Sequence, residues 1–281
     1  MSVEELNDRL IDLAFAEDIG DGDHTTLCCI PADAMGKSKL LIKEEGVLAG
    51  MEIAKEVFRR FDPDMKVEVF IQDGTHVKPG DVAMVVTGRV RSLLQTERLM
   101  LNIMQRMSGV ATQTAVYVKE LEGLKTKVLD TRKTTPGMRV LDKIAVKLGG
   151  GENHRMGLFD MVILKDNHID FAGGILKAIP LTREYLKEKG KDIPIEVEVR
   201  SLDDIRDVFA AGGCGRIMLD NFTSELTREA VKLIGGRAEI ESSGGITLKN
   251  LREYAECGVD FISVGALTHQ IKSLDLSLKA C

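Results

Sequence analysis

Six short apolar runs in the second half of the chain each lead into a polar or glycine-rich cluster. They span residues 127–130, 160–164, 194–199, 216–219, 237–241 and 260–264. Their spacing of roughly 20–35 residues suits strands joined by crossover helices. In a (β/α) barrel the strands fill the core, and the loops after their C-terminal ends form one rim that holds the active site. Six units are clear and a seventh is weaker, so the pattern predicts an α/β fold with an incomplete (β/α) barrel. A doubly wound sheet is the alternative, and it would place its site at a single crevice.

The first third of the chain has a different pattern. Residues 4–17 are expected to form an amphipathic helix, and short strands are expected at 37–43, 66–72 and 82–86. The acidic stretch 18–23 lacks the later glutamate of a calcium loop and is interpreted as a turn. This region therefore predicts a small β-rich domain. It leads into a long helical stretch at 93–121, which is one helix or two that break at Ser108 and Gly109.

Composition excludes several classes of protein. Apolar residues make up 44% of the 281 residues, enough for a large core, and no apolar run is long enough to cross a membrane. The net charge of −6 argues against general nucleic-acid binding, which needs a basic face. The acidic start lacks a signal-peptide core, and the five cysteines form no CxxC pair. These features predict a reduced, cytoplasmic protein.

One stretch opposes the acidic balance. Residues 125–147 contain seven lysines and arginines against two aspartates. Such a cluster in an acidic protein predicts a small anionic substrate, drawn in by a focused field. Lys143 and Lys147, one helical turn apart, are interpreted as a solvated helix face. The pairs Arg132–Lys133 and His154–Arg155 adjoin strand ends and glycines, which favours a functional role.

The last strand ends carry candidate groups for a phosphorylated substrate. Glycines in 242–245 and 264–266 allow backbone N–H groups to approach a phosphate, at the usual barrel position for such a site. Glu198 and Asp220 end the middle strands, where carboxylates suit a hydrated Mg²⁺ or sugar hydroxyls. Glu196 shares a strand face with Glu198, which favours a shared charged site over an isolated buried pair.

Cationic side chains near the other strand ends suit carboxylates or phosphates. They are Arg132, Lys133, His154, Arg155 and Lys165. A Schiff-base role for Lys165, as in barrel aldolases, is the alternative, but a substrate dianion would keep this amine charged. No Ser-His-Asp or Cys-His arrangement stands out in the sequence.

Taken together, these residues make the chain resemble the quinolinate phosphoribosyltransferases, type II phosphoribosyltransferases of NAD biosynthesis. The resemblance covers essentially the whole chain. It is carried by EDIGD at 17–21, ERLMLN at 97–102, SGVAT at 108–112, DTRKTTPG at 130–137, GGGENHR at 149–155, LKDNH at 164–168, EVEV at 196–199, LDNF at 219–222, SGGI at 243–246 and VGALTH at 264–269.

The resemblance implies an activity and a domain plan. Phosphoribosyl pyrophosphate would donate its phosphoribosyl group to quinolinate, with decarboxylation, giving nicotinate mononucleotide, pyrophosphate and CO₂. Residues 1–108 would form an N-terminal α/β sandwich, to which 267–281 return, and 109–266 the barrel. A molybdenum-transport-associated paralogue shares the fold and many motifs, and is the alternative.

The resemblance also implies roles for individual residues. The quinolinate-binding residues would be Arg98, Arg132, His154, Arg155 and Lys165. The residues for the phosphoribosyl donor would be Lys133, Glu198, Asp220, Ser243, Gly244, Gly245, Gly265 and His269. Lys133, Glu198 and Asp220 would be catalytic, and Glu198 and Asp220 would serve Mg²⁺ directly or through water. Arg98 would reach a neighbouring subunit's site, which makes the enzyme at least a homodimer.

Overall fold

The computed structural model describes residues 2–281, and the chain divides into two compact units. Unit 1 comprises Met1–Val116, Thr134–Gly150 and Leu267–Cys281. Unit 2 comprises Tyr117–Lys133 and Gly151–Ala266. None of the helices formed by residues 2–281 is long and apolar enough to span a bilayer.

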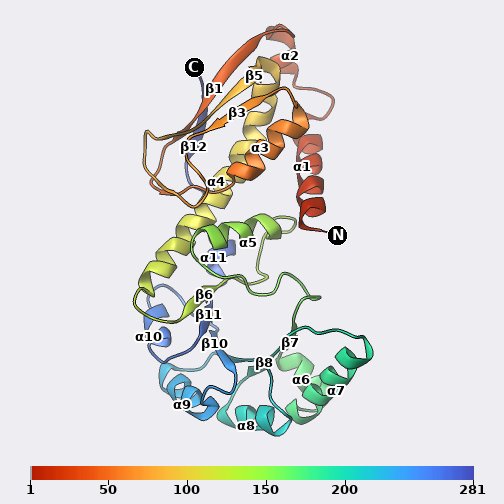
Figure 1. Ribbon diagram of the computed structural model, residues 1–281, viewed down its shortest axis with the longest axis vertical. Coiled ribbons are helices and arrows are strands. Elements are labelled where there is room, and N and C mark those ends of the chain that lie inside the picture. The colour runs from red at the N-terminus through yellow and green to blue at the C-terminus, as the bar shows by residue number, and fades with distance from the viewer. Residues whose placement is uncertain (1) are drawn as a thin grey trace. The chain divides into compact units, whose positions relative to one another are not determined.

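Unit 1 is built on a four-stranded antiparallel sheet in the order β12-β1-β5-β3 (Figure 1). Its strands are β1 (Met35–Ile42), β3 (Lys66–Val69), β5 (Val82–Arg89) and β12 (Leu276–Ala280). The C-terminal strand β12 pairs with β1, with Leu40 opposite Leu278. Two further short strands, β2 (Gly46–Val47) and β4 (His76–Val77), pair with each other. The strands predicted at 37–43, 66–72 and 82–86 thus correspond to β1, β3 and β5.

Helices α1 (Val3–Ile19), α2 (His24–Cys29), α3 (Met51–Phe61) and α5 (Arg139–Leu148) belong to unit 1, as does most of α4 (Val90–Glu120). The long helix α4 continues through Ser108 and Gly109 without a break. Gly109 instead allows the backbone near Lys272 to pack against the helix, because a Cβ at residue 109 would lie 2.3 Å from the carbonyl oxygen of Lys272. The glycine permits a close approach of two backbones within unit 1.

Helix α5 corrects one sequence-based interpretation. Lys147 is exposed, as a solvated helix face requires, but Lys143 is only 1% exposed, so its place on such a face was wrong. Its neighbour Asp142 is also buried, and accepts two hydrogen bonds, at 2.9 and 2.8 Å, from Arg106 on α4. Hydrophobic spacing alone did not show that α5 buries charged groups as well as Val140 and Leu141.

Unit 2 holds a six-stranded parallel sheet in the order β6-β11-β10-β9-β8-β7. The strands are β6 (Lys127–Leu129), β7 (Val162–Leu164), β8 (Ile195–Val199), β9 (Arg216–Asp220), β10 (Glu239–Ser243) and β11 (Phe261–Ser263). All six predicted runs are therefore strands. Strands β7 to β11 are neighbours in chain order without the reversal of a doubly wound sheet, which excludes that alternative. Among the described residues β6 and β7 remain edge strands, so the barrel is incomplete, and a parallel bridge between Leu129 and Glu152 extends the β6 edge.

The helices of unit 2 lie outside this sheet (Figure 1). They are α6 (Asp166–Ala172), α7 (Ile175–Glu188), α8 (Leu202–Ala210), α9 (Ser224–Ile234) and α10 (Leu251–Ala255), and α11 (Ala266–His269) follows β11 across the unit boundary. Side chains cap two of them, because Ser201 accepts from the N–H of Asp204 and Thr223 from that of Leu226. Apolar strand residues such as Val197 and Ile217 are fully buried. This buried core holds the strand ends in fixed positions.

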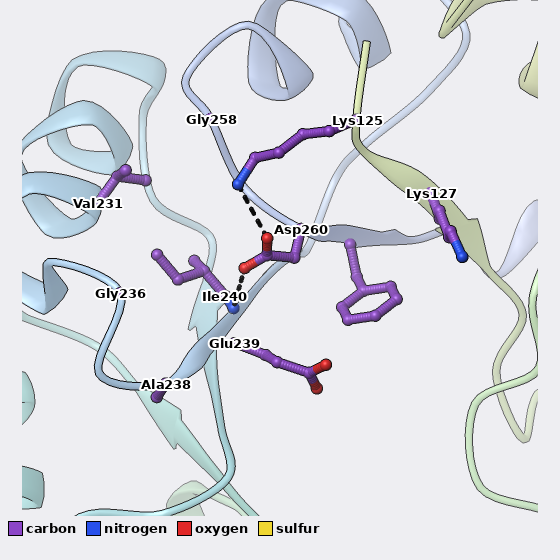
Figure 2. Close-up of a pocket in the computed structure, with 10 residues that line it drawn as sticks. Lys125, Lys127, Val231, Gly236, Ala238, Glu239, Ile240, Gly258 and Asp260 are labelled. Carbon is purple, nitrogen blue, oxygen red and sulfur yellow. Dashed lines mark hydrogen bonds and ion pairs between the residues drawn. The ribbon is translucent and has the colours of Figure 1, made fainter.

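A pocket of about 470 Å³ lies at the N-terminal ends of β6, β10 and β11 (Figure 2). Asp260 is held there by Lys125, at 2.9 Å, and by the N–H of Ile240, at 3.0 Å. Glu239 is paired with Arg216 at 2.9 Å. In barrels this end of the strands serves stability, and these charges are already matched within the protein. Although this pocket is large, its position and its paired charges argue against an active site here.

Candidate active site

A second pocket, of about 330 Å³, lies at the opposite, C-terminal ends of the strands of unit 2. Six of the predicted site residues line it: Arg132, Lys133, His154, Arg155, Lys165 and Ser243. They come from the loop after β6, the segment before β7, the loop after β7 and the end of β10. The cations that the sequence placed near separate strand ends thus converge on one cavity.

Lys165 and Glu198 join the ends of two neighbouring strands. The Nζ atom of Lys165 donates to Glu198 Oε2 at 2.9 Å. The Glu198 side chain is 8% exposed and that of Lys165 46% exposed, so the ammonium group reaches solvent while its partner is held inside. The Lys165 amine is thus occupied by an ion pair, whereas a Schiff-base lysine must be free to attack a carbonyl group.

Arg155 is partly buried and lies near a second guanidinium group, that of Arg132. Burial, and then the nearby charge of Arg132, lower the pKa of the Arg155 guanidinium from its ordinary value. Its Nη1 atom donates to the carbonyl oxygen of Met161 at 3.1 Å. Two guanidinium groups that repel each other within one pocket are an arrangement that an anionic ligand would relieve.

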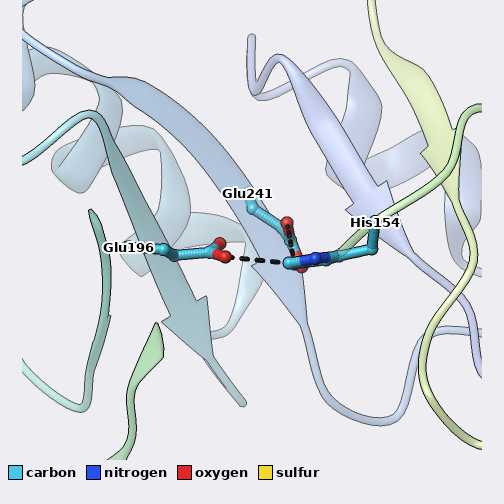
Figure 3. A group of neighbouring side chains, drawn as sticks. All are labelled: His154, Glu196 and Glu241. Atoms are coloured by element: carbon cyan, nitrogen blue, oxygen red, sulfur yellow. Dashed lines mark ion pairs between the residues drawn. The ribbon is translucent and has the colours of Figure 1, made fainter. Parts of the chain in front are cut away.

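The base of the site is a buried cluster of His154, Glu196 and Glu241, drawn in Figure 3. His154 Nε2 lies 3.0 Å from Glu196 Oε2 and 3.3 Å from Glu241 Oε2. Both glutamates are fully buried and His154 is 8% exposed. The three side chains could also hold a metal ion, since one ligand atom from each lies within 4.8 Å of the others.

The electrostatics of this cluster are finely balanced. Burial lowers the pKa of His154, but hydrogen bonds to Glu196 and Glu241 outweigh it and raise the pKa to about 9. Burial, and then the charge of Glu241, raise the pKa of Glu196 to about 7. The N–H of Arg155 opposes protonation of His154, because it donates to Nδ1 at 2.7 Å and so requires that nitrogen to carry no proton. Nδ1 therefore acts as an acceptor in this arrangement, while Nε2 lies between the two carboxylates.

The ends of β9 and β10 form the other side of the rim. Asp220 pairs in register with Ser243, and the N–H of Asn221 donates to the Ser243 carbonyl oxygen at 2.9 Å. The side-chain amide of Asn221 donates to Asp220 Oδ2 at 2.9 Å. Asn221 has φ 54°, the one non-glycine residue with positive φ among residues 2–281. A strained backbone at such a strand end is typical of a functional site.

The remaining predicted residues are less closely grouped. Gly244 and Gly245 follow Ser243 directly, with φ 90° and 63°. Gly265 lies just past the end of β11, in the same unit. Arg98, on α4, and His269, in α11, are exposed residues of unit 1, so their predicted roles stay predictions.

Sequence reasoning missed two residues of this site. Glu241 lines the pocket and contacts His154, yet the run 237–241 was interpreted only as a strand. Its alternation with Glu239 on either side of Ile240 was the available signal. Asn221 was noted only within a motif, and a single sequence gives no sign of its left-handed backbone.

The parallel sheet, the cationic pocket and the glycine-rich strand ends define an enzyme-like barrel suited to anionic, phosphate-bearing ligands. Comparisons with known proteins identify the family within this class. Residues 23–108 match the family model for the quinolinate phosphoribosyl transferase N-terminal domain, and residues 110–279 match that for the C-terminal domain. The chain belongs to the quinolinate phosphoribosyl transferase family.

Individual relatives agree with this assignment. The chain is 45% identical over 285 residues to a chloroplastic nicotinate-nucleotide pyrophosphorylase (carboxylating) of Arabidopsis thaliana, across 96% of this chain and 81% of that protein. It is 41% identical to a probable nicotinate-nucleotide pyrophosphorylase (carboxylating) of Bacillus subtilis, across 96% and 92% of the two chains. A crystal structure of NadC from Streptococcus pyogenes superposes with a TM-score of 0.92 at 39% identity, covering 100% of this chain and 99% of that one.

Proposed function

We propose that this chain transfers the phosphoribosyl group of phosphoribosyl pyrophosphate to quinolinate, with decarboxylation, giving nicotinate mononucleotide, pyrophosphate and CO₂. The observation that carries the proposal is the convergence of Arg132, Lys133, Arg155 and Lys165 on one pocket at the C-terminal ends of the strands. Such a pocket suits a small polyanion. Family membership over both halves of the chain supports the choice of this polyanion.

Quinolinate carries two adjacent carboxylates on a pyridine ring. Arg132 and Arg155 offer planar guanidinium groups that can pair with a carboxylate through two hydrogen bonds, and Lys165 offers a point charge. His154 lies beneath them at the base of the pocket. We assign these four residues to the dicarboxylate, and add Arg98 from a second subunit.

The phosphoribosyl donor takes the other side of the rim. Ser243, Gly244, Gly245 and Gly265 lie at the ends of the last two strands, where glycines leave backbone N–H groups open to a phosphate. We assign His269 to the same phosphate from the resemblance. Lys133 would stabilise the charge that develops on the departing pyrophosphate.

Magnesium is the proposed cofactor. Glu198 and Asp220 offer carboxylate oxygens at the ends of adjacent strands, which is the donor chemistry that Mg²⁺ prefers, directly or through its water shell. When bound, the ion would neutralise diphosphate charge. The protein's own part is to hold both carboxylates in place, through Lys165 for Glu198 and through Asn221 for Asp220.

The reaction needs no protein nucleophile, because the pyridine nitrogen attacks C1 of the ribose as pyrophosphate leaves. Holding two anions in line contributes proximity, and the fixed charges of the pocket contribute electrostatic stabilisation. Glu198 and Asp220 would stabilise the positive charge that develops on the sugar. Once the nitrogen is quaternary, the adjacent carboxylate leaves as CO₂ because the cationic ring stabilises the carbanion, which a proton then quenches.

A product assay tests this proposal. The purified protein, given quinolinate and phosphoribosyl pyrophosphate with Mg²⁺, should release pyrophosphate and CO₂ in equal amounts. Arg132→Ala should abolish turnover while the circular dichroism spectrum stays native. Pyrophosphate without CO₂ would indicate a different acceptor, and binding of a phosphosugar without either product would favour the molybdenum-associated alternative.

The active form is proposed to be at least a homodimer with shared sites. Arg98 is exposed on α4. Three large apolar side chains that lie close along the chain to pocket residues are also exposed: Leu158, Phe159 and Phe171, at 72, 70 and 92%. Exposed apolar groups beside a site favour a protein partner. If each site takes Arg98 from its neighbour, mixing inactive Arg98→Ala with inactive Arg132→Ala subunits should restore activity. A mixture that stays inactive after subunit exchange would contradict shared sites.

We also propose a cytoplasmic location, which the five free cysteines support.

A further inference from the structure

The buried cluster beneath the pocket draws on segments far apart in the chain (Figure 3). Glu196 is on β8 and Glu241 on β10, with β9 between them in the sheet, while His154 lies in the segment before β7. Both carboxylates nevertheless reach the same ring nitrogen, at 3.0 and 3.3 Å. Buried carboxylates are costly unless they have a partner. Glu241 also lies 3.5 Å from Arg216 Nη1, and the partner that both carboxylates share is His154, a residue of the pocket.

Both nitrogens of the His154 ring are engaged. Nε2 faces the two carboxylates, and Nδ1 accepts the backbone N–H of Arg155 at 2.7 Å. The backbone N–H of His154 also donates to Asp130 Oδ1 at 2.9 Å. The ring is thus held by a hydrogen bond at Nδ1 and by ion-pair contacts with two carboxylates at Nε2. In this orientation neither nitrogen faces an incoming carboxylate.

The ring in turn places the next residue. Its Nδ1 atom fixes the backbone of Arg155, and the carbonyl oxygen of Met161 fixes the guanidinium at 3.1 Å. Arg155 lines the pocket and is one of its cations. Arg155 is thus held at its backbone N–H and at its guanidinium group. The contact at the backbone N–H depends on the orientation of the His154 ring.

We propose that Glu196 and Glu241 are positioning residues of the dicarboxylate site, acting through His154 on Arg155. His154 then serves quinolinate indirectly, as a brace, instead of contacting its carboxylate. The inference rests on the proposed function for the identity of the ligand. It adds two residues to the site and changes the role of a third.

The test measures quinolinate binding by calorimetry together with steady-state KM values for both substrates. Glu196→Ala and Glu241→Ala should each weaken quinolinate binding about tenfold, as expected for loss of a charged hydrogen bond, and change the KM for phosphoribosyl pyrophosphate less than about twofold. Glu196→Gln and Glu241→Gln keep an acceptor oxygen for Nε2 and should recover most of the affinity. Glu229→Gln is the control, an exposed glutamate on α9 outside the cluster, and should bind as the unchanged protein does.

A double-mutant cycle separates positioning from general stability. In a His154→Ala background, Glu241→Ala should weaken quinolinate binding no further, because the link to Arg155 is already lost. Equal losses for both substrates, or losses that multiply across the cycle, would show a merely structural role and overturn the inference. So would a stoichiometric divalent metal in the purified protein that leaves with Glu196→Ala. An unchanged protein that binds quinolinate but makes no product would refute the proposed function alone.

Discussion

Gly244 should be the most sensitive single position on the donor side of the site. It has φ 90°, and a Cβ added there would lie 2.2 Å from Asn221 Oδ1 and 3.0 Å from the Asn221 backbone nitrogen. A contact of 2.2 Å cannot be accommodated, so Gly244→Ala must displace the Asn221 side chain. That side chain holds Asp220 through its amide group at 2.9 Å. The substitution therefore reaches Asp220 without touching it.

The next residue provides a matched comparison. Gly245 has φ 63°, but a Cβ there would meet no described atom within 4 Å. Within the protein itself, Gly245→Ala should cost only the left-handed backbone penalty of about 1–2 kcal/mol, and crowding of the bound phosphate by the new Cβ would affect both variants. Gly244→Ala carries the same penalty and also loses the charged hydrogen bond from Asn221 to Asp220, which contributes about 1.5–3 kcal/mol. If that difference falls on donor binding, the two variants should differ in the KM for phosphoribosyl pyrophosphate by about 10- to 150-fold.

Steady-state kinetics with each substrate varied in turn measures this difference, and thermal unfolding monitors the fold. The KM for quinolinate should change little in either variant, because Arg132, Arg155 and Lys165 lie on other loops. Equal KM values for the donor in the two alanine variants would refute the reasoning, because they would show that the contact with Asn221 has no consequence. A rise in both KM values together would show instead that the whole rim had moved.

Three further predictions follow from the same contacts. Asn221→Gly, which keeps the positive φ, should lose only the bond to Asp220, whereas Asn221→Ala should also destabilise the loop; donor KM and melting temperature distinguish the two. In unit 1, burial opposes ionisation of Asp62, but Arg89 and Ser92 outweigh it and lower the pKa of Asp62 below 3.8. Its stabilising effect is present above that value and is lost as the pH falls through the lowered pKa. Asp62→Asn should therefore cost about 1–3 kcal/mol at about pH 7, and progressively less as the pH is lowered below 3.8, measured by urea unfolding. Chelation of divalent ions should abolish turnover while quinolinate binding, followed by calorimetry, persists.

The parts of the structure that depend on local pattern could be predicted. Each of the six strands lies in a run of apolar residues, and the parallel arrangement brings Arg132 and Lys165 to one rim. Arg155 reaches the same rim because the parallel bridge between Leu129 and Glu152 precedes it. The parts that depend on register and side-chain direction could not. Glu241 meets His154 across 87 residues of chain, and no local signal encodes that pairing. The burial of Lys143 was missed for the same reason, since helical spacing describes a face without showing what covers it.

The charges of the pocket explain why the ligand should carry two carboxylates. Lys165 is paired with Glu198, and Glu241 contacts His154 and Arg216, so neither of these carboxylates forms an ion pair with Arg132 or Arg155. The pKa of Arg155 is lowered first by burial and then by the charge of Arg132, so an anionic ligand would stabilise the charged guanidinium. One carboxylate would satisfy one guanidinium group and leave the other repelled, whereas two adjacent carboxylates can satisfy both. Selection of a dicarboxylate over nicotinate then comes from the unpaired charge that the smaller ligand would leave behind, and it needs no steric exclusion.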